Sequence, residues 1–334
     1  MKEPEKSAAG ALAAGEGRNG PPRASAVVST WNKKDDLREN LAALRAQTRP
    51  FDQIVVVDNA SRDGTAEMVA REFPEVDLIV MPHDRYGACE TFNIGFRTAT
   101  GDAIAIMDDD VVATPGWLAT LEAALLAEPP TTALVSSRVI EPGMPEAYQR
   151  AEVARGRYYA ATFRGCGTLA RASVLAAAGG YDERFFIYGN ERDLAARVLA
   201  AGHRILQLPD AVIHHATPFG MKAGKRSLYY HVRNFWLYAF KNCAWRDILR
   251  ALWSMTGKGL GGGGGRREHG TATAGSDERE LEATGTMGLG RALRETPGAW
   301  WIVVKATAAG FLLLPYCLTR RAVVRSPDFR PLGL

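Results

Sequence analysis

The sequence predicts an α/β fold in which helices cover both faces of a mostly parallel sheet. Short apolar runs alternate with segments of helical periodicity over residues 26–107. The run at 54–57 is entirely β-branched, which is typical of a strand buried on both faces of a parallel sheet. Asp58 and Asp108 directly follow two of these runs. Open α/β sheets bind their ligands at such strand ends, so a ligand site is expected there.

The expected elements follow in chain order. Strands are expected at residues 26–30, 54–57, 77–81, 103–107, 133–137, 205–208 and 211–213. Helices are expected at residues 35–47, 61–72, 90–100, 116–127, 192–201 and 225–250. Leu37, Leu41 and Leu44 recur on one face of the first helix. Gly202 stands where the residue after a helix end is expected.

The helix at 225–250 interleaves aromatic and basic residues, which leaves two interpretations. It could lie on a membrane surface, or it could pack against the core with a basic outer face. We favour packing, because Tyr229, Trp236 and Phe240 recur at near-helical spacing.

The composition of the 334 residues indicates which partners and which domain organisation to expect. The net charge of +4 is mixed in sign along the chain rather than gathered in a basic stripe, so no nucleic-acid partner is expected. The four cysteines form no CxxC pair and are interpreted as buried thiols in a reducing compartment. Residues 1–24 have no apolar signal segment and are expected to be disordered. A single domain is expected over 25–250, followed by a flexible glycine-rich insertion at 257–290.

The C-terminal segment, 291–334, is apolar and basic and is a candidate membrane anchor. Residues 299–318 have the length of a membrane span, but Lys305 and Pro315 interrupt them. Tryptophans lead the stretch and arginines follow it, a pattern that favours an interfacial helix over a span. We therefore expect a cytoplasmic protein that associates with the inner face of the cell membrane.

Three consecutive carboxylates, Asp108, Asp109 and Asp110, follow the strand at 103–107. They would repel one another unless a cation lay among them. A hard divalent cation such as Mg²⁺ or Mn²⁺ that also binds phosphate oxygens would relieve this repulsion. The alternative is a solvated acidic turn, which the strand-end position disfavours.

Asp58 ends another buried strand and is suited to accept the imide N–H of a uracil or thymine ring. It also stands where it can cap the turn formed by Ser61, Asp63 and Gly64. The two roles are compatible.

Seven short motifs, taken in order, resemble the family 2 glycosyltransferases of GT-A fold. The sequence reads Val-Val-Ser-Thr-Trp-Asn at 27–32, Val-Asp-Asn-Ala-Ser-Arg-Asp-Gly-Thr at 57–65, Asn-Ile-Gly at 93–95 before Ala-Thr-Gly-Asp at 99–102, Met-Asp-Asp-Asp-Val at 107–111, Gly-Gly-Tyr-Asp-Glu at 179–183, Tyr-Gly-Asn-Glu-Arg-Asp-Leu at 188–194 and Val-Ile-His-His at 212–215. The resemblance covers residues 24–245. It is nearest to bacterial rhamnosyltransferase-like and galactofuranosyltransferase-like members, and it implies a Rossmann-like nucleotide-binding sheet with a C-terminal helical extension.

The resemblance implies a role for each matching residue. Those implied to bind the nucleotide are Thr30, Asp58, Asn59 and Asp108. Those implied to hold the metal, Mn²⁺ or Mg²⁺, are Asp108, Asp110 and His214, with His215 as the alternative to His214. The partners implied are a nucleotide-diphosphate sugar donor and a glycan or lipid-linked acceptor, as in cell wall or polysaccharide biosynthesis.

The catalytic base is where the sequence departs from the family pattern. Similar enzymes carry Glu-Asp-x-Asp-Leu, with the second acidic residue as base. This chain has Asn-Glu-Arg-Asp-Leu at 190–194, which puts Glu191 at the base position. A glutamate performs the same proton abstraction. Asp193 is expected to have a structural role, since residues two apart on a helix point in different directions.

The implied reaction is a metal-assisted direct displacement at the anomeric carbon, with inversion of configuration. A catalytically impaired nucleotide-sugar-binding protein of the same fold is the alternative, and the altered pair Asn190-Glu191 is its best support. A sugar-nucleotide pyrophosphorylase fits less well, because residues 30–34 lack the glycine-rich loop that a triphosphate requires. The same absence counts against a dinucleotide-binding dehydrogenase.

Overall fold

The structure is a computed structural model that describes residues 22–220, 224–250 and 293–331. The predicted insertion at 257–290 lies outside the described residues, as does the predicted disordered segment up to residue 21. Ala24, which the prediction placed in that segment, is instead the fully buried first residue of a strand.

Nine strands form one mixed sheet within the described part of the chain, in the order β3-β2-β1-β4-β8-β6-β9-β5, with β7 also paired to β9. The strands are β1 (Ala24–Thr30), β2 (Gln53–Asp58), β3 (Asp77–Val80), β4 (Ala103–Asp108), β5 (Val111–Ala113), β6 (Thr132–Ile140), β7 (Tyr158–Tyr159), β8 (Thr168–Arg171) and β9 (Arg204–His215). Strands β1 to β4 are parallel, as predicted, and their carboxyl ends share one edge.

The other half of the sheet differs from the parallel arrangement that the sequence predicted. Strand β8, which the sequence reading did not identify, runs antiparallel to both β4 and β6. The two short strands expected at 205–208 and 211–213 are parts of the single strand β9. Its pairing with β6 skips from Leu208 to Val212, so residues 209–211 form a bulge. Pro209 lies in this bulge, where its missing N–H costs no ladder hydrogen bond.

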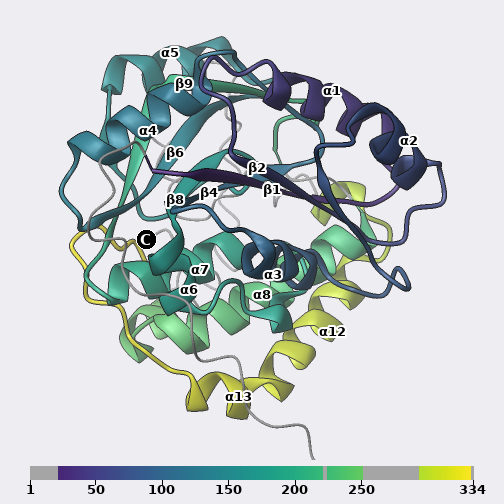
Figure 1. The fold of residues 1–334 in the computed structure, drawn as a ribbon. Helices are drawn as coiled ribbons and strands as arrows, with labels where there is room; N and C mark the ends of the chain where they lie inside the picture. The colour runs from purple at the N-terminus through teal and green to yellow at the C-terminus, as the bar shows by residue number, and fades with distance from the viewer. Residues whose placement is uncertain (1–21, 221–223, 251–292, 332–334) are drawn as a thin grey trace, which may run out of the picture.

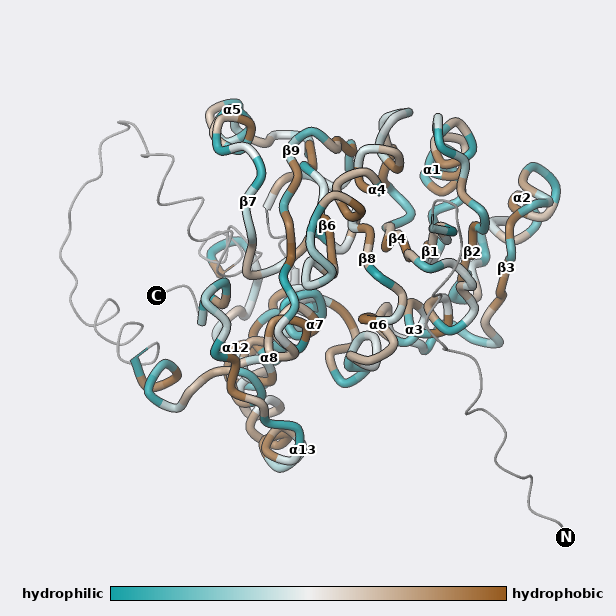
Figure 2. The backbone as a smooth tube through the Cα atoms, turned by 60° about the vertical axis from the view of Figure 1, so that its left-hand side comes forward, coloured by the Kyte–Doolittle hydropathy of each residue, from teal (hydrophilic) through white to brown (hydrophobic). Residues whose placement is uncertain are grey.

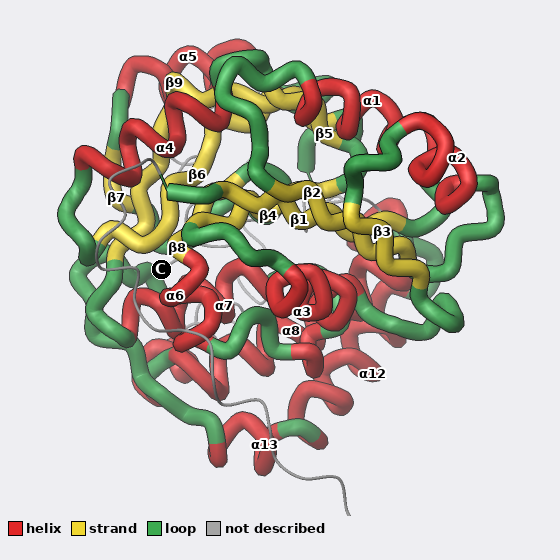
Figure 3. Tube along the Cα trace, in the orientation of Figure 1, coloured by secondary structure: helices red, strands yellow, loops and turns green. Residues whose placement is uncertain are grey.

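Helices cover both faces of the sheet, giving three layers (Figures 1 and 3). The helices are α1 (Lys34–Arg45), α2 (Thr65–Glu72), α3 (Ala88–Thr98), α4 (Trp117–Ala127), α5 (Glu146–Arg155), α6 (Ala172–Ala178), the 3₁₀ turn η1 (Glu183–Phe185), α7 (Asn190–Ala200), α8 (Lys225–Asn242), α12 (Ala299–Leu312) and α13 (Leu314–Thr319). Helices α1, α2 and α4 lie on one face, and α3, α6, α7 and α8 lie on the other. The sequence predicted the α/β class and most of these helices, but not α5 and α6.

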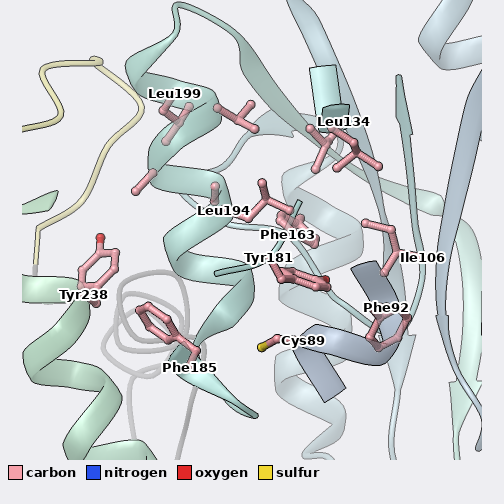
Figure 4. Close-up of a cluster of buried hydrophobic side chains, with 14 of the residues drawn as sticks. Cys89, Phe92, Ile106, Leu134, Phe163, Tyr181, Phe185, Leu194, Leu199 and Tyr238 are labelled. Carbon is pink, nitrogen blue, oxygen red and sulfur yellow. The ribbon is translucent and has the colours of Figure 1, made fainter. Parts of the chain in front are cut away.

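The layers enclose two apolar clusters, one on each face of the sheet. Alternate residues of the central strands supply them: Val55 and Val57 face one cluster, and Val56 faces the other. Figure 4 shows part of the first cluster, including Phe185, Leu194 and Tyr238. This two-sided burial explains the uninterrupted β-branched run in β2.

Helix α8 packs against the core, as the aromatic spacing predicted. Trp236 and Phe240 are buried. The helix ends at Asn242, and a separate helical segment occupies 245–250, so the predicted single helix over 225–250 is interrupted at Cys243. All four cysteines are buried and unpaired, which confirms their interpretation as thiols.

The C-terminal helices pack on the outer side of α8. Gly310 fits closely against Trp236, because a Cβ at position 310 would lie 2.7 Å from the Cβ of Trp236. The indole Nε1 of Trp236 donates to Thr307 Oγ1 at 3.2 Å. Figure 2 shows hydrophobic segments inside the sheet and again along α12 and α13, at the periphery. No helix in the described parts of the chain is long and apolar enough to cross a membrane.

Candidate active site

A cleft of about 580 Å³ opens at the carboxyl ends of β1, β2 and β4. Among the residues that line it are Thr30, Asn59, Asp108, Asp109, Asp110, Glu141, Gly165, Tyr188, Glu191, His215 and His231. The cleft thus contains most of the residues predicted to bind the nucleotide, hold the metal or serve as the base. Asp58 is fully buried just beneath it, next to Asn59.

The three carboxylates form the turn between β4 and β5. Asp108 is the last residue of β4, and Val111 begins β5. Strand β5 pairs antiparallel with β9, which sets Val111 opposite His215. This pairing places the histidine at the end of β9 beside the acidic turn.

The histidine at the acidic turn is His215, whereas the prediction named His214 first. The imidazole Nε2 of His215 lies 3.0 Å from Asp110 Oδ1. Asp108, Asp110 and His215 each offer one ligand atom, and these atoms lie within 4.8 Å of one another. Successive side chains of a strand point to opposite faces, so His214 is directed away and is exposed. The structure therefore places the predicted alternative, His215, beside the acidic turn, and it does not place His214 there.

The acidic turn carries more negative charge than its surroundings neutralise. Burial raises the pKa of Asp108 to about 7, and it raises the pKa of Asp109 to about 7 as well. Burial also acts to raise the pKa of Asp110, but the hydrogen bond and charge of His215 outweigh it and hold that pKa below its usual range. A divalent cation would allow all three groups to ionise together.

Glu141 orients the imidazole of His215, and sequence reasoning missed it. The Nδ1 of His215 lies 2.9 Å from Glu141 Oε1, which leaves Nε2 directed at Asp110. Burial would lower the pKa of His215, but its bonds to the two carboxylates raise that pKa to about 10. A carboxylate behind an imidazole is the usual way in which a histidine ligand is oriented. Glu141 follows β6 with no motif around it, so the sequence contains no signal for this role.

Two further partners of Asp110 were also missed. Thr217 Oγ1 donates to Asp110 Oδ2 at 2.9 Å, and Lys33 Nζ lies 3.4 Å from the same oxygen. Lys33 comes from the loop after β1, and His215 and Thr217 come from the end of β9 and the residues after it, so two separate segments converge on this one carboxylate.

Three residues predicted to bind a nucleotide end in buried polar atoms that have no hydrogen-bond partner among the described residues. These atoms are Thr30 Oγ1, Asp58 Oδ2 and Asn59 Oδ1. Asp58 Oδ1 accepts from the backbone N–H of Ser61 at 3.2 Å, which confirms the predicted turn and leaves Oδ2 unused. A buried polar atom without a partner is costly. A ligand that hydrogen-bonds them would relieve this cost.

Glu191 lies in the first turn of α7 and lines the cleft. Gly165 faces it: a Cβ at position 165 would lie 2.5 Å from Glu191 Oε1, so any larger residue there would shift the carboxylate. Burial raises the pKa of Glu191. A carboxylate with a raised pKa is a stronger base than one in water.

Asp193 points away from the cleft and is fully buried. Its carboxylate lies 2.7 Å from Lys241 Nζ and 2.9 Å from Arg197 Nε. Lys241 also lies 2.5 Å from Asp182 Oδ2, so this lysine links α8 to both ends of the segment 182–193. These contacts support the structural role predicted for Asp193.

The comparisons with known proteins agree with this geometry. Residues 25–178 match the family model described as Glycosyl transferase family 2. The chain is also similar to the N-acetylglucosaminyl-diphospho-decaprenol L-rhamnosyltransferase of Mycobacterium tuberculosis, with 26% identity over 69% of this chain and 88% of that protein. Residues 25–178 therefore form a family 2 glycosyltransferase domain.

Two solved structures share the fold of this glycosyltransferase. The mannosyltransferase PcManGT of Pyrobaculum calidifontis, in complex with GDP-Man and Mn²⁺, has a TM-score of 0.51 and 22% identity over 89% of this chain and 76% of that one. GalNAc-T7 with UDP, GalNAc and Mn²⁺ has a TM-score of 0.56 and 14% identity over 86% of this chain and 58% of that one. Both likenesses confirm the predicted GT-A fold.

Proposed function

We propose that this glycosyltransferase moves a sugar from a nucleoside-diphosphate sugar to a glycan or lipid-linked acceptor, with inversion at the anomeric carbon. One observation carries the proposal. One cleft, together with Asp58 buried beneath it, contains all three features that the reaction needs. These are the acidic group of Asp108 and Asp110 with His215, the partnerless polar atoms of the predicted nucleotide site, and the carboxylate of Glu191.

The partnerless atoms favour a uracil or thymine base. Asp58 Oδ2 is suited to accept the imide N–H of either ring, and Thr30 Oγ1 and Asn59 Oδ1 are free to bond the base or the ribose. The two structural neighbours were solved with different nucleotides, GDP-Man and UDP, so the fold itself leaves the base open. The choice rests on Asp58.

Asp108, Asp110 and His215 fit a divalent cation, because carboxylates and imidazole together suit Mn²⁺. The solved neighbours contain Mn²⁺. A bound cation would supply positive charge where the departing diphosphate carries negative charge. The protein's own part is to hold its ligands in place, which Glu141 does for His215 and Thr217 does for Asp110.

Glu191 is proposed as the general base that takes the proton of the acceptor hydroxyl. It is the carboxylate in the cleft that is not part of the acidic turn or bound to His215. A single displacement needs one base and no covalent intermediate, and it inverts the anomeric centre.

The acceptor class is proposed from the mycobacterial relative, whose name states that it acts on N-acetylglucosaminyl-diphospho-decaprenol. A lipid-linked acceptor of this kind would place the enzyme in cell wall or polysaccharide biosynthesis. It would also require the protein to work at a membrane.

The proposed donor is tested by a thermal-shift screen of the wild-type protein. Uridine or thymidine diphosphate with Mn²⁺ is expected to raise Tm, because a ligand bound only by the folded state stabilises it by about 2.7 kcal/mol at a hundred times its Kd. Mn²⁺ or nucleotide alone should raise Tm less. A shift that is the same for adenosine diphosphate, or that needs no metal, would contradict the proposed donor site.

We further propose that the protein associates peripherally with the cytoplasmic face of the cell membrane through α12 and α13. Trp300, Trp301 and Leu312 are 73%, 68% and 82% exposed. Arg320 and Arg325 follow α13 in sequence, and they suit the anionic lipids of that leaflet. Exposed tryptophans with a basic flank are typical of interfacial helices.

Replacing both tryptophans, in Trp300→Ser with Trp301→Ser, is expected to weaken binding to anionic phospholipid vesicles by about tenfold or more. The measurement is co-sedimentation with vesicles at low salt. Point variants are preferable to removing 298–334, because that deletion would uncover Trp236 in the core. Leu126→Ser, on the opposite side of the sheet, is the control. Equal binding of the double variant and the wild type would contradict the anchor.

A further inference from the structure

Two aromatic stacks join the loop before α7 to one face of α8. Phe186 stacks on Tyr230 with ring centroids 5.2 Å apart, and Tyr188 stacks on His231 with centroids 4.5 Å apart. The two stacks differ in one respect: Tyr188 and His231 line the cleft, and neither Phe186 nor Tyr230 does.

The loop that carries both stacks is held in an unusual conformation. Phe186 and Tyr188 both have φ of 66°, a left-handed backbone that residues with side chains rarely adopt. Asn234 of α8 holds the loop there, since its Nδ2 lies 2.9, 2.8 and 2.7 Å from the carbonyl oxygens of Phe185, Ile187 and Tyr188. Strained backbone of this kind persists where surrounding contacts determine it, and it is concentrated at ligand sites.

His231 presents a hydrogen-bond acceptor. Its Nδ1 lies 2.8 Å from the carbonyl oxygen of Ser227, and a carbonyl can only accept, so Nδ1 carries the proton. Burial lowers the pKa of His231, which keeps the ring neutral. Nε2 therefore retains its lone pair in a residue that lines the cleft.

Through Tyr188, the stack is next to the proposed base along the chain, and both line the same cleft. Tyr188 precedes Glu191 by three residues, so the loop runs directly into the turn that holds the base. Thr30, Asn59 and Asp108 come instead from the strand ends of β1, β2 and β4. In a single displacement the acceptor hydroxyl attacks the face of the anomeric carbon opposite the leaving nucleotide, so the acceptor must contact the base.

We propose that Tyr188 and His231 form the subsite for the sugar ring of the acceptor, an inference that rests on the proposed function. The apolar C–H face of a sugar packs on an aromatic surface, and a sugar hydroxyl donates to Nε2 of His231.

The experiment measures sugar transfer to a short-chain N-acetylglucosaminyl diphosphate lipid, with Mn²⁺ and saturating donor. His231→Phe keeps a ring in the stack and removes Nε2, and it is expected to raise the acceptor KM about tenfold with little change in kcat. His231→Leu removes the ring as well and should raise this KM further. The affinity for uridine diphosphate with Mn²⁺, from calorimetric titration, should stay unchanged in both variants.

Tyr230→Leu is the matched control, because it breaks the other stack between the same loop and the same helix. If it raises the acceptor KM as much as His231→Leu does, the effect comes from loop structure and the subsite is wrong. An unchanged KM in the His231 variants would also overturn the proposal. So would wild-type protein that binds the nucleotide but transfers nothing to this lipid. Protein that binds no nucleotide with Mn²⁺ would instead contradict the proposed function itself.

Discussion

Glu191→Gln is expected to lower sugar transfer by a factor of about a hundred to ten thousand, the range typical of losing a general base. Glutamine keeps the size of the side chain and fits the space left by Gly165, but it cannot accept a proton at neutral pH. Donor binding should survive, because Glu191 is not among the residues grouped at the acidic turn. The measurement is kcat at saturating donor and acceptor, together with calorimetric titration of the nucleotide.

The pH dependence gives the same experiment a second readout. The base must be deprotonated to act, and burial raises the pKa of Glu191. Turnover should therefore fall as the pH drops through that raised value, above the ordinary range of an exposed glutamate. In Glu191→Gln the residual turnover should no longer show this fall at low pH.

Asp193→Asn is the comparison that could overturn the assignment of the base. Because Asp193 is buried between Lys241 and Arg197, the variant should lose stability by about 3–5 kcal/mol. Whatever protein remains folded should keep most of its turnover. If folded Asp193→Asn were inactive while Glu191→Gln stayed active, the base would be Asp193.

The sequence predicted the parallel half of the sheet and the residues at its edge. Buried β-branched runs identify strands that are covered on both faces, and parallel strands must present their carboxyl ends together. Asp58 and Asp108 could therefore be assigned to one ligand edge without a structure. The reversed strand β8 could not be predicted in this way, because four residues carry too little periodicity.

The choice between His214 and His215 depends on which residues of β9 point into the cleft, and the sequence does not reveal this. Adjacent residues of a strand face opposite ways, and the bulge at residues 209–211 resets which of them faces the cleft. Glu141 and His231 were missed for a related reason. Each gains its role from a contact between segments far apart in sequence.

The affinity of Asp110→Ala for uridine diphosphate in the presence of Mn²⁺ tests the proposed cation site. Removing this carboxylate takes one charged ligand from the group of Asp108, Asp110 and His215. The Mn²⁺-dependent affinity is expected to fall by more than about a hundredfold, since even residues behind the ligands affect metal affinity by about 10–100-fold.

Asp109→Ala is the matched control, because Asp109 is the neighbouring carboxylate of the same turn and is not part of that group. It should weaken the affinity much less. Calorimetric titration of both variants and the wild type, each with and without Mn²⁺, decides the matter. Asp110→Ala is expected to lose the metal dependence and Asp109→Ala to retain it; an unchanged, Mn²⁺-dependent affinity in Asp110→Ala would rule out the cation site.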